Sequence, residues 1–241
     1  MLRRRVILAV MGRAPSAEGK TRLLASLPTA DGAGLRRALL RDTLDVVGRI
    51  EAASKAVLYT PEDAETEFRE LVPVGTRLLP QRGRDLGERL HHAFVDLLQG
   101  ETEAALIIGS DVPTLPPRYV EMGIEALDQR PGHVVLGPSP DGGYYLIGLT
   151  RPAPRLFEDI PWGTSGVTER TLERARGLAL DVELLPEWYD IDSAGDLEAL
   201  ARGDTAGAAP TATHTRAWLR AAPAEVRRKV IGQAGPGPGG S

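Results

Sequence analysis

Short apolar runs alternate with longer amphipathic stretches along most of this chain, and this alternation limits the fold more than any other feature. Short apolar runs bounded by turn residues are typical of strands, whereas apolar residues three and four apart are typical of helices. We expect strands over residues 5–11, 55–60, 76–80, 104–109, 134–136, 144–149 and 181–185. We expect helices over residues 35–50, 61–71, 85–99, 118–129, 164–176 and 193–202.

Strands that alternate with helices at this spacing predict an α/β fold, a three-layer sandwich with a mainly parallel, Rossmann-like central sheet. The two predicted strands between residues 134 and 149 lie too close together for a full crossover helix. Parallel neighbours need such a crossover, so this part of the sheet can include an antiparallel pairing.

The length of 241 residues fits one domain with an appendage. We expect the folded domain over residues 1–203, and a flexible C-terminal extension over residues 204–241. Residues 203–210 are small and polar, which is typical of a linker, and residues 232–241 are rich in Gly and Pro. Between them, residues 213–231 could form a basic helix, with Trp218 and Leu219 on one side.

Composition excludes several classes of function. A formal net charge of −4 opposes binding to a nucleic acid polymer, which needs a basic surface. The absence of cysteine excludes a thiolate metal site, a cysteine nucleophile and a disulfide framework. No apolar run reaches membrane-spanning length, and residues 6–11 are too short for the core of a signal peptide. We therefore expect a cytoplasmic protein with no membrane partner.

Two segments indicate a binding cleft. The apolar run 106–109 ends two residues before Asp111, and Asp141, Gly142 and Gly143 directly precede the apolar run 144–149. Ligands of α/β sheets bind at the carboxyl ends of strands, and glycine lets a ligand approach the backbone closely. These segments predict a cleft for a metal and a nucleotide. The alternatives are a turn at Asp111 and an ordinary hairpin turn at residues 141–143.

The loop after the first predicted strand contains APSAEGKT at residues 14–21, which fits a relaxed phosphate-loop pattern. A P-loop NTPase is therefore a competing interpretation. Against it, Ala14 replaces the first glycine of that pattern, and Pro15 removes an N–H from a loop that must cradle phosphate. Alternatively, the loop brings only positive charge to a donor's phosphates, through Arg13, Lys20 and Arg22.

Six segments occur in an order that resembles a known family. They are residues 15–23 (PSAEGKTRL), 81–90 (QRGRDLGERL), 109–115 (GSDVPTL), 136–145 (LGPSPDGGYY), 156–162 (LFEDIPW) and 189–197 (YDIDSAGDL). Over residues 6–200 the chain resembles the radical-SAM/selenodomain-associated transferase family, type 1. That family belongs to the glycosyltransferase A-like, nucleotide-diphospho-sugar transferase superfamily. The resemblance implies the superfamily's fold and a nucleoside triphosphate or nucleotide sugar as donor.

The resemblance also implies which residues contact the donor and the metal. The implied nucleotide-binding residues are Arg13, Lys20, Arg22, Gln81, Ser110 and Asp111. Asp111 would bind Mg²⁺ or Mn²⁺ together with Asp190 or Asp192. Two carboxylates and substrate phosphates suffice for such a cation, which prefers oxygen ligands. If Asp192 instead caps the following helix, Asp190 is the freer candidate.

The implied chemistry is group transfer to a small-molecule acceptor. Lys20, Arg22 and Asp111 would be catalytic, because phosphoryl chemistry depends on positioning and charge neutralisation. The acceptor side would consist of Asp141, Gly142, Gly143, Tyr144 and Trp162. An aromatic such as Trp162 is also a common packing residue.

Gly109 stands where sugar transferases of this fold usually carry the first acid of Asp-x-Asp. We therefore expect nucleotidyl transfer from a nucleoside triphosphate to a small phosphorylated or acidic acceptor. The first alternative is a glycosyltransferase that uses a nucleotide-diphospho-sugar. The further alternatives are a P-loop NTPase and a nucleotide-binding module without catalysis.

Overall fold

The computed structural model describes residues 5–17, 27–51, 53–130, 132–203 and 212–231. Seven of the described segments are strands that form one sheet. They are β1 (Val6–Arg13), β2 (Ala53–Thr60), β3 (Arg77–Pro80), β4 (Ala104–Gly109), β5 (Val134–Pro138), β6 (Tyr144–Leu149) and β7 (Val182–Leu184).

The strand order is β3-β2-β1-β4-β6-β5-β7. Neighbouring strands are parallel except at β6, which runs antiparallel to both β4 and β5. The predicted α/β fold with a mainly parallel sheet is therefore confirmed. The antiparallel strand lies where two strands were expected to be too close for a crossover, because only a short turn joins β5 to β6.

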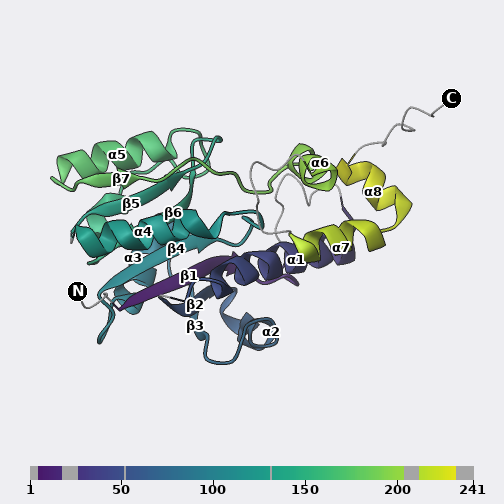
Figure 1. The fold of residues 1–241 in the computed structure, drawn as a ribbon, viewed down its shortest axis with the longest axis horizontal. Coiled ribbons are helices and arrows are strands. Elements are labelled where there is room, and N and C mark those ends of the chain that lie inside the picture. The colour runs from purple at the N-terminus through teal and green to yellow at the C-terminus, as the bar shows by residue number, and fades with distance from the viewer. Residues whose placement is uncertain (1–4, 18–26, 52, 131, 204–211, 232–241) are drawn as a thin grey trace.

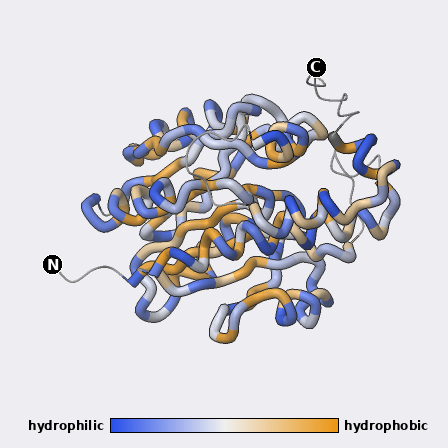
Figure 2. Tube along the Cα trace, turned by 45° about the vertical axis from the view of Figure 1, so that its right-hand side comes forward, coloured by the Kyte–Doolittle hydropathy of each residue, from blue (hydrophilic) through white to orange (hydrophobic). Residues whose placement is uncertain are grey.

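Helices cover both faces of the sheet, and each predicted helix is present (Figure 1). The helices are α1 (Thr29–Gly48), η2 (Glu62–Ala64), α2 (Glu65–Arg69), α3 (Leu86–Leu97), α4 (Pro117–Gln129), η3 (Pro154–Phe157), α5 (Val167–Gly177), α6 (Ala194–Arg202), α7 (Thr213–Ala221) and α8 (Ala224–Ile231). Hydrophobic residues gather along the strands between the helices (Figure 2).

Two apolar clusters separate the three layers. In β1, Leu8 and Val10 pack with α1, α2 and α4 on one face, while Ile7 and Ala9 pack with α3, η3 and α5 on the other. A strand covered on both faces is apolar at successive positions, which explains the continuous run in the sequence. None of the described helices is long and apolar enough to cross a membrane.

A third apolar cluster joins the C-terminal helices to α1. It contains Leu35, Leu39, Ile191, Leu197, Leu200, Ala212, Leu219 and Val230. Helices α6, α7 and α8 form a group beside the sheet (right in Figure 1). Residues 213–231 therefore form packed helices, as the alternative of a helix there allowed, while residues 204–210 of the predicted linker and the Gly- and Pro-rich end lie outside the described residues. The helices pack through long-range contacts, because the apolar faces of α7 and α8 find partners on α1 and α6.

Candidate functional site

A cavity of about 290 Å³ lies at the carboxyl edge of the sheet, where β1 and β4 end. Strand β1 lies between β2 and β4, so the order in which the chain adds strands reverses at β1. Doubly wound sheets bind ligands at the carboxyl ends of the strands where this order reverses. The polar and charged residues that line the cavity include Arg13, Thr60, Gln81, Arg89, Ser110, Asp111 and Tyr144.

Gln81 is fixed at this edge by the backbones of two strands. Its Nε2 atom donates to the carbonyl oxygen of Gly12 at 3.0 Å and to that of Leu58 at 2.8 Å. Since both carbonyl groups belong to strands, the side-chain amide is held across the ends of β1 and β2. Arg13, the last residue of β1, lines the same cavity.

Ser110 approaches β1 closely. A Cβ atom on Gly12 would lie 2.8 Å from the Cβ atom of Ser110, so a larger residue at position 12 would displace the loop. The carbonyl oxygen of Ser110 also accepts a hydrogen bond from Thr43 Oγ1 of α1, at 3.1 Å. This loop is therefore anchored to both β1 and α1 one residue before Asp111.

Asp111 lies beside three other carboxylates. Burial, together with the negative charges of Asp190, Asp192 and Asp141, raises the pKa of Asp111 to about 7. Burial and the charges of Asp141, Asp192 and Asp196 raise the pKa of Asp190 to about 6. The raised pKa values of both acids therefore reflect burial first, and then the like charges of neighbouring carboxylates, which disfavour ionisation.

The backbone brings the C-terminal acids to Asp111. The amide of Ile191, which separates Asp190 from Asp192, donates to the carbonyl oxygen of Asp111 at 2.8 Å. The alternative interpretation of Asp192 as a helix cap is wrong, because Ser193 caps α6 and accepts from the amide of Asp196 at 3.2 Å. Asp190 and Asp192 therefore both stay candidate ligands.

The acids Asp85 and Asp141 have different local roles. Asp85 caps α3 by accepting from the amide of Glu88 at 2.9 Å. Asp141 lies in the turn between β5 and β6, and one of its carboxylate oxygens accepts from the amide of Gly143 at 2.9 Å. Gly142 has a φ of +89°, and a Cβ atom on it would lie 2.0 Å from the carbonyl oxygen of Ser165. Residues 141–143 thus form a hairpin turn that faces the loop before α5.

Tyr144 lines the cavity, whereas Trp162, the turn at residues 141–143, Asp190 and Asp192 are not among its lining residues. Trp162 stands edge-on to Tyr144 with 6.2 Å between ring centroids, and its indole nitrogen lies against Gly87 of α3. The position of Trp162 therefore favours the packing interpretation that the sequence left open.

The structure does not describe every candidate residue, and it adds one. Lys20 and Arg22 lie outside the described residues. Arg89 lines the cavity, and its Nε atom donates to the carbonyl oxygen of Gly83 at 3.2 Å. Sequence reasoning missed Arg89. A signal for it was present in the sequence, because Arg89 lies one helical turn after the predicted cap Asp85. The first turn of α3 begins at the carboxyl edge of the sheet.

A second group that could hold a metal lies between α1 and α7. Single ligand atoms of Asp42, Asp45 and His214 lie within 4.8 Å of one another. Asp42 also accepts hydrogen bonds from the amide of His214 at 2.9 Å and from the amide and hydroxyl of Thr215 at 2.7 and 2.6 Å. This carboxylate therefore already serves the first turn of α7.

The sheet, with its cavity at the carboxyl edge, forms an α/β fold that resembles the fold of nucleotide-diphospho-sugar transferases. Residues 43–164 match the family described as "Uncharacterized protein conserved in bacteria (DUF2064)", and the chain belongs to that family. No curated protein matches the sequence at a significant level.

Solved structures agree on the fold. A Desulfovibrio desulfuricans G20 protein, provisionally described as a nucleotide-diphospho-sugar transferase, is 30% identical, with a TM-score of 0.80 over 94% of this chain and 98% of that one. CMP:2-keto-3-deoxy-manno-octonic acid synthetase complexed with CTP is 12% identical, with a TM-score of 0.54 over 83% and 100%. Mycobacterium tuberculosis Rv0371c in complex with manganese is 14% identical, with a TM-score of 0.50 over 80% and 95%. At these lower identities the likeness concerns the fold alone.

Proposed function

We propose that this chain is a divalent-metal-dependent transferase that takes a nucleoside triphosphate and transfers its nucleotidyl group to a small acceptor. One observation carries the proposal: Asp111, crowded by Asp141, Asp190 and Asp192, lies at the edge of a cavity that Arg13 and Gln81 also line. Acidic and basic groups at the same strand edge suit a metal and a phosphate chain.

The proposed metal is Mg²⁺ or Mn²⁺, held by Asp111 and by Asp190 or Asp192. The donor set fits such a cation, because these ligands are carboxylate oxygens whose mutual repulsion a divalent charge would relieve. When bound, the metal would neutralise the phosphates of the donor and orient them. The manganese in the Rv0371c structure supports this choice of metal.

The nucleotide would occupy the cavity, with Arg13, Gln81, Ser110 and Arg89 around it. Lys20 and Arg22 would neutralise the charge that develops on the leaving pyrophosphate. The CTP of the CMP:2-keto-3-deoxy-manno-octonic acid synthetase structure supports a nucleotide in a fold of this kind.

In the proposed reaction, an oxygen of a small phosphorylated or acidic acceptor attacks the α-phosphorus. The new P–O bond forms as the bond from the α-phosphorus to the bridging oxygen breaks, and pyrophosphate leaves with the electron pair of that bond. Tyr144, which lines the cavity, and the adjoining turn at Asp141, Gly142 and Gly143 would form the acceptor side. Trp162 would act there indirectly, by supporting the ring of Tyr144.

Glycosyl transfer from a nucleotide-diphospho-sugar is the second candidate, and the 30% identity to the Desulfovibrio protein favours it. Gly109 favours nucleotidyl transfer, because it places no second acid two residues before Asp111, where sugar transferases of this fold usually carry one. The glycosyltransferase A-like fold disfavours a P-loop NTPase. We further infer that the chain belongs to the radical-SAM/selenodomain-associated transferases of type 1.

Titration with MnCl₂ in a calorimeter tests the metal assignment. Asp111→Asn and Asp190→Asn should each weaken Mn²⁺ binding by about tenfold or more, because each removes one charged ligand. The matched control is Asp181→Asn, which lies next to the amino end of β7, at the opposite edge of the sheet. Wild-type affinity in Asp111→Asn would refute the proposed site.

A further inference from the structure

Ile191 attaches the segment that carries Asp190 and Asp192 in two ways. Its amide donates to the carbonyl oxygen of Asp111 at 2.8 Å. Its side chain is only 3% exposed and belongs to the third apolar cluster, which we call the C-terminal cluster. A shift of Ile191 would move both acids, because they are its direct neighbours in the chain.

The C-terminal helices contribute side chains to the cluster that contains Ile191. Leu219 of α7 is 5% exposed and Val230 of α8 is fully buried, and both belong to the same cluster. Helix α8 also packs against α6, which begins just after Asp192. Ile191 therefore shares an apolar cluster with helices that follow it in the chain by more than twenty residues.

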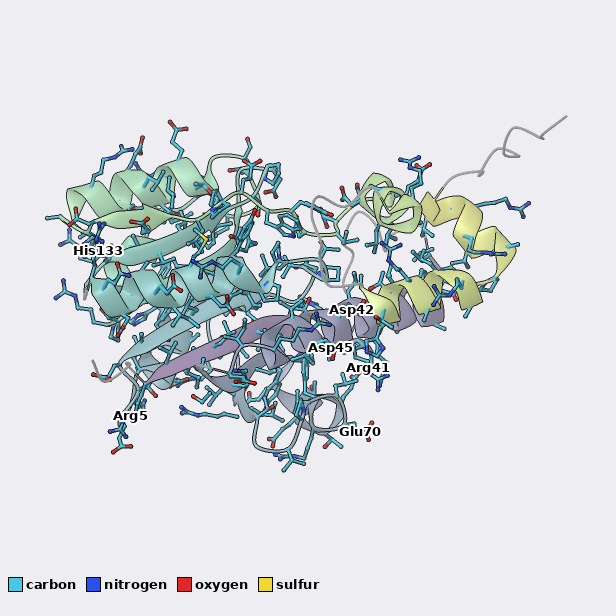
Figure 3. All side chains as sticks on the ribbon, viewed as in Figure 1. Arg5, Arg41, Asp42, Asp45, Glu70 and His133 are labelled. Atoms are coloured by element: carbon cyan, nitrogen blue, oxygen red, sulfur yellow. The ribbon has the colours of Figure 1, made fainter. Side chains whose placement is uncertain are left out.

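Asp42 fastens α7 to α1 at the other end of this arrangement. Asp42 is only 3% exposed. Its carboxylate accepts hydrogen bonds from the backbone amides of His214 and Thr215 and from the hydroxyl of Thr215. The residue before α7, Ala212, supplies no side-chain cap, so Asp42 serves the helix from 172 positions away in the sequence. Figure 3 shows Asp42 and Asp45 on α1, where α7 runs alongside.

Helix α1 connects this contact to the site. Thr43, the residue after Asp42, donates to the carbonyl oxygen of Ser110, next to Asp111. Near the start of α1, a Cβ atom on Gly34 would lie 2.8 Å from the indole nitrogen of Trp218, so α7 and α1 are in close contact. One helix therefore contacts the loop of Asp111 on one face and α7 on another.

We infer that α7 and α8 are a positioning element of the site: through the C-terminal cluster and the Asp42 contact, they hold Asp190 and Asp192 against Asp111. Asp42 and Leu219 are positioning residues in this arrangement, because they would act on the acids through α7 and the C-terminal cluster. The inference rests on the proposed function only where it assigns a metal to these acids.

Hydrogen exchange of the Ile191 amide tests the inference without metal, in EDTA and at a temperature where every variant is folded. Asp42→Asn removes a carboxylate oxygen that accepts hydrogen bonds from the first turn of α7. Leu219→Ala removes buried side-chain atoms from the C-terminal cluster. Each should speed exchange of this amide by about tenfold. If Asp42→Asn fails to fold, Leu219→Ala decides alone.

Two matched controls separate positioning from general destabilisation. Asp181→Asn makes the same change at an exposed acid next to the amino end of β7, and Leu97→Ala makes the same deletion in the cluster beneath α3, where Leu97 is fully buried. Both should leave Ile191 exchange within about threefold of the wild type. Unchanged exchange in Leu219→Ala, or equal acceleration in Leu97→Ala, would overturn the inference.

A parallel Mn²⁺ titration separates this inference from the proposed function. If the inference holds, Leu219→Ala weakens Mn²⁺ binding by about threefold to tenfold, while Asp181→Asn and Leu97→Ala do not. If the wild type binds no Mn²⁺, the proposed function fails, and Ile191 exchange still decides whether α7 and α8 position the segment.

Discussion

At the scale of single residues, the ionised form of Asp111 lowers the free energy of unfolding. Its pKa in the folded protein is raised to about 7, whereas an unfolded Asp ionises near pH 4. Between these values the folded state binds more protons than the unfolded state. The contribution of Asp111 to stability therefore falls as the pH rises from about 4 to about 7.

Asp111→Asn should remove this pH-dependent loss. The variant should gain free energy of unfolding relative to the wild type as the pH rises, by up to about 3–4 kcal/mol above pH 7, with little gain near pH 4. Urea denaturation at pH 4.5 and pH 8, with metal chelated, measures the difference. A stability difference that does not change between the two pH values would contradict the raised pKa.

At the scale of secondary-structure elements, the turn between β5 and β6 depends on Gly142. Alanine there would face both a left-handed backbone, with φ at +89°, and a contact of 2.0 Å with the carbonyl oxygen of Ser165. Gly142→Ala should lower the free energy of unfolding by about 2–4 kcal/mol, since strain and overpacking add.

Gly163→Ala is the control for this turn. Gly163 also has a positive φ, +79°, but no neighbouring atom lies within 4 Å of the added Cβ atom. Gly163→Ala should therefore lower the free energy of unfolding by only about 1 kcal/mol, from the backbone alone. If urea denaturation shows the same loss of free energy of unfolding for both variants, the contact between an added Cβ atom at position 142 and Ser165 contributes nothing to that loss.

The elements of the core could be predicted because their signals are local. Buried strands such as β1 and β4 are continuous apolar runs, and α3 carries its own cap at Asp85. The start of α1 could not be placed, because residues 29–34 are mostly small or polar and include two glycines. The packing of α7 could not be predicted either, since its cap comes from Asp42, far away in the chain.

At the scale of the whole molecule, the site collects residues from distant parts of the chain at one sheet edge. Asp111 could be predicted because an acid follows a buried strand, and the resemblance implied Asp190 and Asp192. Their proximity could not be predicted, because it depends on the Ile191 contact and on how α6 packs. Arg89 and Thr43 were missed because their roles appear only after the helices dock on the sheet.

The most direct test of the central claim is a thermal-shift panel of nucleoside triphosphates and nucleotide sugars, with and without Mg²⁺, on the wild type and Asp111→Asn. A ligand at a hundred times its dissociation constant stabilises the folded state by about 2.7 kcal/mol, a visible shift. We predict a Mg²⁺-dependent shift with a nucleoside triphosphate that Asp111→Asn abolishes. A shift with nucleotide sugars alone would favour glycosyl transfer. No metal-dependent shift with either ligand class would contradict the claim that this edge of the sheet is a metal-dependent nucleotide site.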